Sequence, residues 1–216
     1  MKTRPRWKSF FSYYFSYFAR PGRTVAELLN DSGRVRLAVF ALLIPAVGYT
    51  VMYFCGWIAG GAPSSFKPWL AIPIDQYFKY DIFIVAPSMF MCWVLTAGVI
   101  QLLARLVSST GTFEDTAAAL GFGIGVATWA TLVHDLTDAV LSALGIINMK
   151  AYEAALNGPT FWRALLWTLF SVYFIWMITL FAKGVRAAHK LGWISSVALG
   201  LAAFIVYQGI FFVFNR

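Results

Sequence analysis

Long apolar runs alternate with short polar segments along the chain. Five runs have the roughly 20 residues that a helix needs to cross the hydrocarbon core of a bilayer. They cover Val35 to about Ala59, Ile82 to about Leu106, Thr116 to about Asp135, Phe161–Ala182 and Trp193–Phe214. The pattern therefore predicts an all-α protein, a polytopic membrane helix bundle of five transmembrane helices.

The third span differs from the others because its small and bulky residues separate onto opposite faces of a helical wheel. The small and polar face holds Ala118, Gly121, Gly125, Thr128, Thr131, Asp135 and Asp138. The bulky face holds Phe122, Val126, Trp129, Val133, Leu136 and Val140. Small residues allow a neighbouring helix backbone to approach closely, so we expect the other spans to gather around this helix.

Two features of the third span leave alternatives open. Gly121 and Gly125 form a G-x-x-x-G pattern, which favours close packing within the chain over a seam between two copies. The helix either continues to Ile147 or breaks near Asp135–Asp138.

Residues 1–34 form a predicted cytoplasmic or interfacial segment, and residues 35–216 form the membrane domain. The stretch Trp7–Phe18 mixes aromatic residues with serine and is too short to cross a bilayer. It fits the headgroup zone of the membrane, or it packs on the bundle without touching lipid.

A short helix is predicted between this stretch and the first span. Pro21 and Gly22 interrupt the chain, and Thr24 and Glu27 follow in the T-x-x-E spacing of a capping box. We therefore expect a helix that starts at Thr24 and ends at Ser32-Gly33.

Composition and charge agree with a membrane protein. Hydrophobic residues make up 60% of the chain and charged residues 12%, about half of what soluble domains carry. The net charge is +8, but the basic residues flank the spans, which favours anionic lipid headgroups over nucleic acid. Cys55 and Cys92 lie in apolar runs and are predicted to be buried free thiols.

The distribution of Lys and Arg predicts a cytoplasmic N-terminus and an outside C-terminus. Twelve basic residues fall on the N-terminal side of a five-span arrangement: Lys2, Arg4, Arg6, Lys8, Arg20, Arg23, Arg34, Arg36, Arg105, Lys183, Arg186 and Lys190. Five fall on the other side: Lys67, Lys79, Lys150, Arg163 and Arg216. Three of the twelve belong to Ala182–Gly192, a predicted basic link that also contains His189.

One group of residues resembles a chemical site. His134 and Asp138 are four residues apart, so with Asp135 they are candidates to share a metal ion or a proton. A solvated helix end at the outer interface is the favoured interpretation, because ionisable residues indicate function mainly within the hydrocarbon. The chain contains no H-E-x-x-H, G-x-S-x-G or phosphate-binding glycine loop. We therefore predict no enzyme activity, no catalytic residue and no cofactor.

Three motifs resemble bacterial members of the Yip family. The first is ARPGRTVAELLND, a proline-led short helix before the first span, and the second is GTFEDTAAALGFG, a polar turn before an alanine-rich helix. The third is VRAAHKLGW, which resembles the end of the Yip domain, so the likeness extends over about Arg20–Arg216. The predicted packing and interaction positions are Pro21, Thr24, Glu27, Gly111, Thr112, Phe113, Gly121, Gly125 and Thr128.

The resemblance implies a five-span membrane protein with a cytoplasmic N-terminus. Eukaryotic members are associated with Rab-type GTPases, vesicle budding and Golgi or endoplasmic reticulum membranes. This chain has about 34 residues before its first span and lacks the acidic D-L-Y-G-P-type signature. The resemblance thus points to a bacterial inner-membrane protein and away from GTPase binding.

We therefore expect a non-enzymatic membrane protein that organises the membrane or scaffolds a membrane complex through helix packing. Its expected partners are the lipid bilayer and either another protein or a second copy of the chain, without nucleic acid. The alternative is a transporter or channel for a small solute, ion or lipid, with the Gly121–Asp138 face lining the path.

Overall fold

The computed structural model describes residues 6–62, 69–70, 72–107 and 110–215, and within these ranges the chain is helical and contains no strand. The α-helices are α1 (Arg6–Ala19), α2 (Pro21–Leu29), α3 (Arg34–Ile58), α4 (Tyr77–Leu106), α5 (Phe113–Ala127), α6 (Trp129–Ala143), α7 (Met149–Asn157), α8 (Phe161–His189) and α9 (Trp193–Phe214). A 3₁₀ turn, Ile74–Gln76, precedes α4. The predicted all-α class is confirmed. Four residues of the charge count, Lys2, Arg4, Lys67 and Arg216, lie outside the described ranges.

Four of the described helices, α3, α4, α8 and α9, are long and apolar enough to cross a membrane. The pair α5 and α6 passes the same test jointly, as one bent span or as a re-entrant loop, which brings the count to five. Large apolar side chains face outward on these helices: Phe83 is 74% exposed, Ile175 68% and Ile194 84%. A soluble protein would not leave so much apolar surface uncovered, so these helices fit a bilayer.

The helix expected from Thr116 to about Asp135 breaks at Thr128, whereas the sequence predicted either continuation to Ile147 or a break near Asp135–Asp138. Helix α5 ends at Ala127 and α6 begins at Trp129. The Thr131 hydroxyl donates to the Thr128 carbonyl at 3.2 Å, and the Leu132 amide donates to the same oxygen at 3.0 Å. The Thr128 carbonyl therefore accepts from both of these groups at the break.

Two other boundaries correct the predictions. Helix α4 begins at Tyr77, five residues before the expected Ile82. The predicted basic link is mostly helix, because α8 continues from Ala182 to His189 and ends where Lys190 adopts a φ of 53°. A left-handed residue of this kind is a common way to end a helix.

The predicted capping box at Thr24 and Glu27 is wrong. Helix α2 begins at Pro21, where the fixed φ of proline suits the first helical position. Thr24 therefore lies inside the helix and donates its hydroxyl to the Arg20 carbonyl at 2.9 Å. Glu27 instead accepts from Arg23 at 2.8 Å on the exposed side of the helix.

The segment 148–160, expected to be a connection, contains helix α7. The side chain of Asn148 accepts a hydrogen bond from the Ala151 amide at 3.0 Å and thereby caps this helix. Two residues of α7, Met149 and Tyr152, are buried.

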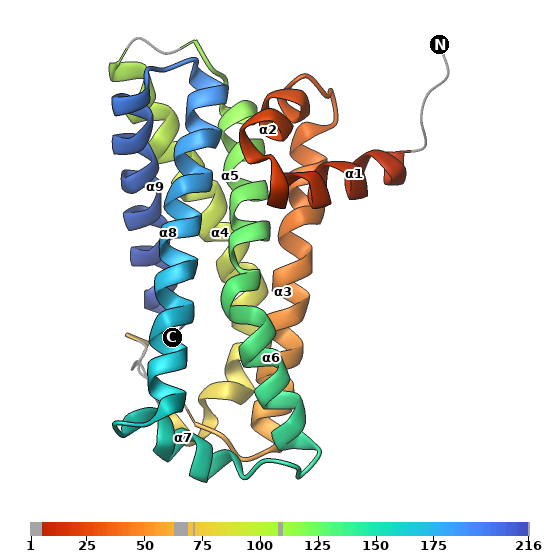
Figure 1. Cartoon of the computed structure of the whole chain (residues 1–216), viewed down its shortest axis with the longest axis vertical. Coiled ribbons are helices and arrows are strands. Elements are labelled where there is room, and N and C mark those ends of the chain that lie inside the picture. The colour runs from red at the N-terminus through yellow and green to blue at the C-terminus, as the bar shows by residue number, and fades with distance from the viewer. Residues whose placement is uncertain (1–5, 63–68, 71, 108–109, 216) are drawn as a thin grey trace. The chain divides into compact units, whose positions relative to one another are not determined.

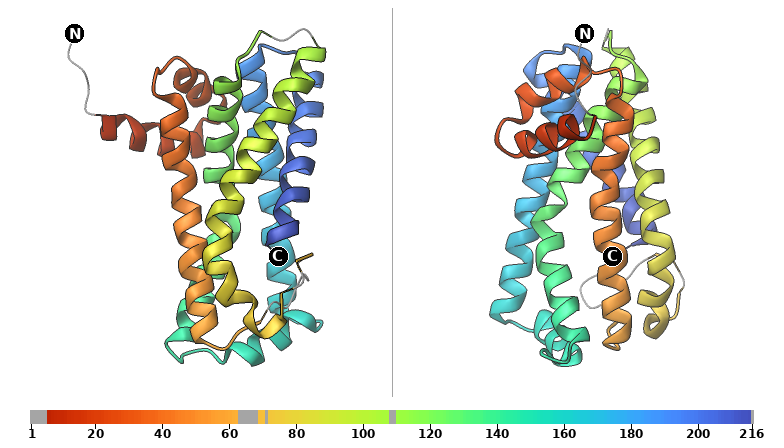
Figure 2. Two further views of the ribbon diagram at one scale, coloured as in Figure 1. Left: turned by 180° about the vertical axis from the view of Figure 1, so that it is seen from behind. Right: turned by 90° about the vertical axis from the view of Figure 1, so that its right-hand side faces the viewer.

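The chain divides into two compact units. Unit 1 is formed by Met1–Leu42, Trp93–Ala127 and Trp176–Val206, and unit 2 is formed by Leu43–Cys92, Thr128–Ile175 and Tyr207–Arg216. In unit 1, α5 forms the core, because every residue from Thr116 to Ala127 is buried. Helices α1 and α2 pack against each other and against α5, as Figures 1 and 2 show.

Candidate functional site

Unit 2 contains a small cavity of about 90 Å³, whose lining is largely apolar with a group of polar side chains. The residues with polar groups are Tyr49, Tyr53, Thr128, Thr131, His134, Asp135, Asp138, Tyr152, Tyr173, Tyr207 and Gln208. A space of this size holds a few water molecules or a small ion. The three candidate residues on α6 therefore lie along one cavity, together with hydroxyl and amide groups from other segments.

His134 is held between an acid and a tyrosine. Its Nδ1 atom is 3.0 Å from Asp135 Oδ1, and its Nε2 atom is 2.9 Å from the Tyr152 hydroxyl. A carboxylate accepts hydrogen bonds, so Nδ1 carries a proton and, in the neutral ring, Nε2 accepts from Tyr152. The side chains of His134 and Asp135 are only 15% and 26% exposed, so the middle of α6, where both residues lie, is not fully solvated.

A second wall of the cavity comes from α3. The Tyr49 hydroxyl and the Thr131 hydroxyl lie 2.9 Å apart, which joins α3 to α6 within unit 2. The sequence alone did not identify Tyr49 or Tyr152, because each reaches the site from a distant segment. Within the part of the chain that the structure describes, no group of three or more His, Cys, Asp or Glu side chains is arranged to hold a metal ion.

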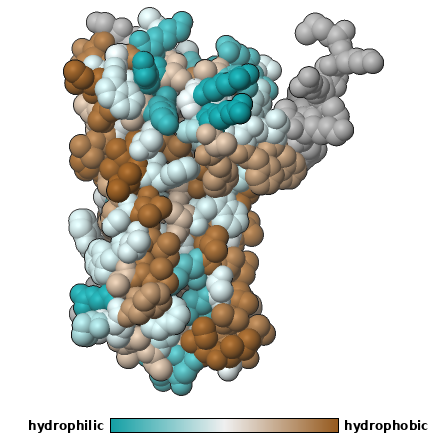
Figure 3. Space-filling model, in the orientation of Figure 1, coloured by the Kyte–Doolittle hydropathy of each residue, from teal (hydrophilic) through white to brown (hydrophobic). Residues whose placement is uncertain are grey.

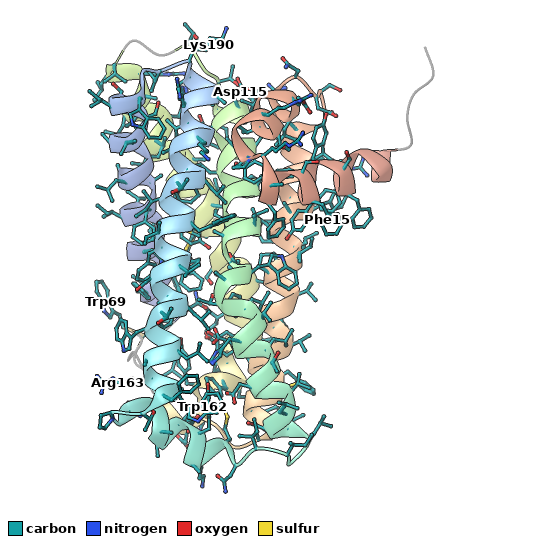
Figure 4. All side chains as sticks on the ribbon, in the orientation of Figure 1. Phe15, Trp69, Asp115, Trp162, Arg163 and Lys190 are labelled. Atoms are coloured by element: carbon teal, nitrogen blue, oxygen red, sulfur yellow. The ribbon has the colours of Figure 1, made fainter. Side chains whose placement is uncertain are left out.

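An open groove of about 610 Å³ adjoins the cavity in unit 2. His134, Asp138 and Tyr152 line both spaces, and apolar residues of α6, α7 and α8 line most of the groove. One of these is Trp162, which lies at the start of α8 beside Arg163 (Figure 4). The three shared residues therefore lie at the boundary between the inner cavity and the surface groove.

The Gly111–Phe113 motif begins α5 in unit 1 and lies against the end of α8. A Cβ atom on Gly111 would collide with the Ala188 carbonyl oxygen, so only glycine fits there. Thr112 and Asp115 form a reciprocal cap: the Thr112 hydroxyl donates to Asp115 Oδ2 at 2.8 Å, and the Asp115 amide donates back at 3.2 Å. Phe113 is 42% exposed.

Asp115 also anchors α3, because its Oδ1 atom lies 2.7 Å from Arg34 Nε in a salt bridge. Both side chains are largely buried, at 19% and 25% exposure, so the pair is better shielded than a surface ion pair. The cap of α5 and the start of α3 are thus held together within unit 1.

His189, expected in a basic link, is buried in a polar network of unit 1. The side-chain nitrogen of Gln101 donates to the Gly111 carbonyl at 2.8 Å. The side-chain oxygen of Gln101 then faces the Thr116 hydroxyl, which donates to it at 2.7 Å. The same hydroxyl also lies 2.8 Å from His189 Nε2 and 3.1 Å from the Thr112 carbonyl oxygen. When Thr116 donates to Gln101, Nε2 carries the proton and donates to Thr116.

Gly121 and Gly125 lie where α3 approaches α5 in unit 1. A Cβ atom on Gly125 would be 2.5 Å from the Ala41 carbonyl oxygen, and one on Gly121 would be 2.9 Å from the Ala38 Cβ. The Gly125 carbonyl also accepts from the Tyr14 hydroxyl at 2.9 Å, which joins α1 to the same point.

The Yip1 domain matches residues 15–214, nearly the whole chain. No curated protein and no solved structure matches the sequence. The match agrees with the predicted resemblance and with the apolar helices described above, which mark a multi-pass membrane protein. The chain therefore belongs to the Yip1 family of integral membrane proteins.

Proposed function

We propose that this Yip1-family protein is non-enzymatic and organises the membrane, or scaffolds a membrane complex, through α1 and α2. The observation that carries the proposal is the two-sided character of α1. Phe10, Tyr14 and Tyr17 are buried, whereas Phe11 and Phe15 are 51% and 66% exposed.

The buried side of α1 fixes the helix to the core of unit 1. The Phe122 ring of α5 lies 6.4 Å from the Phe10 ring and 5.7 Å from the Tyr17 ring, between centroids. With the Tyr14 hydrogen bond to Gly125, these contacts hold α1 in a fixed orientation.

The outer side of α1 presents an aromatic pair. The rings of Phe11 and Phe15 stack with centroids 6.3 Å apart, and Figure 4 shows Phe15 projecting outward from α1. A rigid helix with exposed aromatic rings suits the membrane interface or a partner helix. The charge distribution favours the cytoplasmic face of the membrane for this surface, and the resemblance to bacterial Yip proteins favours the bacterial inner membrane.

Photo-crosslinking in native membranes tests the proposal. A photoreactive amino acid at Phe15 is expected to give a protein adduct of defined mass, from a partner or from a second copy. The control position is Phe83, which is 74% exposed on the span helix α4 and is expected to crosslink to lipid. Only lipid adducts at Phe15, together with a strictly monomeric purified protein, would contradict a scaffolding role.

The cavity of unit 2 supports a second candidate function, the passage or binding of a small polar solute or cation. Asp135 and Asp138 supply negative charge, and the tyrosine hydroxyls supply neutral hydrogen-bonding groups. Carboxylates and hydroxyls inside a helical membrane protein are typical of ion and proton pathways. The adjoining groove supplies an approach to this set of residues.

A further inference from the structure

Unit 1 contains an open pocket of about 610 Å³ between the start of α2 and the end of α8. Ten residues line it, of which five are basic and none is acidic: Ala19, Arg20, Pro21, Gly22, Arg23, Lys183, Arg186, Ala187, Lys190 and Trp193. Figure 3 shows hydrophilic side chains gathered over these two elements. The pocket therefore combines positive charge with the space left by small residues.

The charges of the pocket favour an anion. Five cationic side chains that share one hollow repel one another, and a bound negative group relieves that repulsion. Glu27 pairs with Arg23 at 2.8 Å, but both side chains are more than half exposed, so the pair offsets little of the field. Helix α2 also begins at the pocket, and its N-terminal end adds a partial positive charge.

The shape of the basic groups favours phosphate. Arg20, Arg23 and Arg186 carry guanidinium groups, which bind phosphate oxygens through paired hydrogen bonds, and the two lysines add point charges. The Arg186 guanidinium lies over the Trp193 ring, 5.8 Å from its centroid, which holds this group at the pocket wall.

The surroundings favour a lipid as the source of that phosphate. Trp193 and Ile194 begin the span helix α9 and are 55% and 84% exposed, so apolar surface adjoins the basic pocket. Tryptophan at the end of a span is typical of the headgroup level of a bilayer. A lipid can place its phosphate in the pocket and its acyl chains along α9, whereas free phosphate uses only the first of these surfaces.

We propose that this pocket is a binding site for the phosphate-bearing headgroup of an anionic phospholipid in the cytoplasmic leaflet. This proposal rests on the proposed function, in which α1 and α2 act at the membrane. It specifies the class of lipid that binds where α2 lies beside α8. Lipid binding is measured without any protein partner. A failed crosslink at Phe15 therefore counts against the proposed function, whereas a failed lipid titration counts against the lipid site.

Native mass spectrometry of the detergent-purified protein tests the site. Titration with phosphatidylglycerol is expected to give one retained lipid at lower concentration than titration with phosphatidylcholine. The double variant Arg20→Gln/Lys183→Gln is expected to bind phosphatidylglycerol about thirtyfold more weakly, because each basic residue near an anionic lipid contributes about 1 kcal/mol. The matched control, Arg36→Gln/Arg105→Gln, also removes two basic residues but lies outside the pocket, and is expected to bind as the wild type does.

Two further results decide the source of the anion and the location of the site. Inorganic phosphate added to the wild-type protein is expected to leave the lipid bound, and full displacement at equal concentration would overturn the lipid assignment. Equal weakening in the two double variants would show that diffuse surface charge, and not the pocket, binds the lipid. The phosphate competition and the comparison of the two lipids use the wild-type chain, so they remain decisive if a variant does not fold.

Discussion

Replacement of Gly125 by leucine is expected to prevent the protein from accumulating in a folded form. The added Cβ alone would be 2.5 Å from the Ala41 carbonyl oxygen and 2.8 Å from its carbon, and both are backbone atoms that cannot rotate away. Helix α3 would have to move off α5, and the bond between Tyr14 and the Gly125 carbonyl would be lost with it. We expect a loss of more than about 3 kcal/mol in the free energy of unfolding, above the usual cost of overpacking.

The matched control for this substitution is Gly98→Leu. Gly98 lies in α4, and a Cβ atom there meets nothing within 4 Å, so the same change adds a side chain in open space. The measurement is the yield of monodisperse protein and its unfolding midpoint in an SDS titration in mixed micelles. A Gly125→Leu protein as stable as Gly98→Leu would show that α3 and α5 do not pack at this point.

Alanine at both Asp135 and Asp138 is expected to abolish solute or ion flux in reconstituted liposomes, if the second candidate function holds. Both carboxylates line the unit 2 cavity, and their removal leaves its polar wall without negative charge. A cation loses most of its hydration shell when it enters such a site. Hydroxyl groups alone do not compensate for that loss, so the cation needs the negative charge of the carboxylates.

The control for the flux measurement is Asp31→Ala/Asp75→Ala, which removes two acids outside the cavity lining. This variant is expected to transport as the wild type does. Unchanged flux in the Asp135→Ala/Asp138→Ala protein would remove the acidic pair from the mechanism.

The sequence predicted those features that depend on local pattern. The apolar run Trp193–Phe214 coincides with α9, and Phe161 begins α8 as expected. Hydropathy was sufficient there because a membrane span needs only length and apolar composition. The resemblance to the Yip family rested on local motifs as well and is confirmed by the domain match.

Features that hydropathy does not mark, or that depend on distant segments, were not predicted. The break at Thr128 lies inside the apolar run, where hydropathy gives no signal for it. Tyr152 contacts His134 across 18 positions in sequence, and its helix is short and of mixed composition. His189 was predicted only to lie in a basic link, because its partner Thr116 is 73 positions away in sequence.

The most direct test of the five-span account is the side of the membrane on which each chain end lies. The α5–α6 pair decides the result, because one bent span places the ends on opposite sides and a re-entrant loop places them on the same side. The measurement is labelling with a membrane-impermeant thiol reagent, in a chain whose Cys55 and Cys92 are replaced by alanine. One variant carries a cysteine at Ser12, which is exposed on α1, and the other carries a cysteine appended after the C-terminus. We predict that Ser12→Cys is labelled only from the cytoplasmic side and the appended cysteine only from the outer side, and labelling of both from one side would contradict the account.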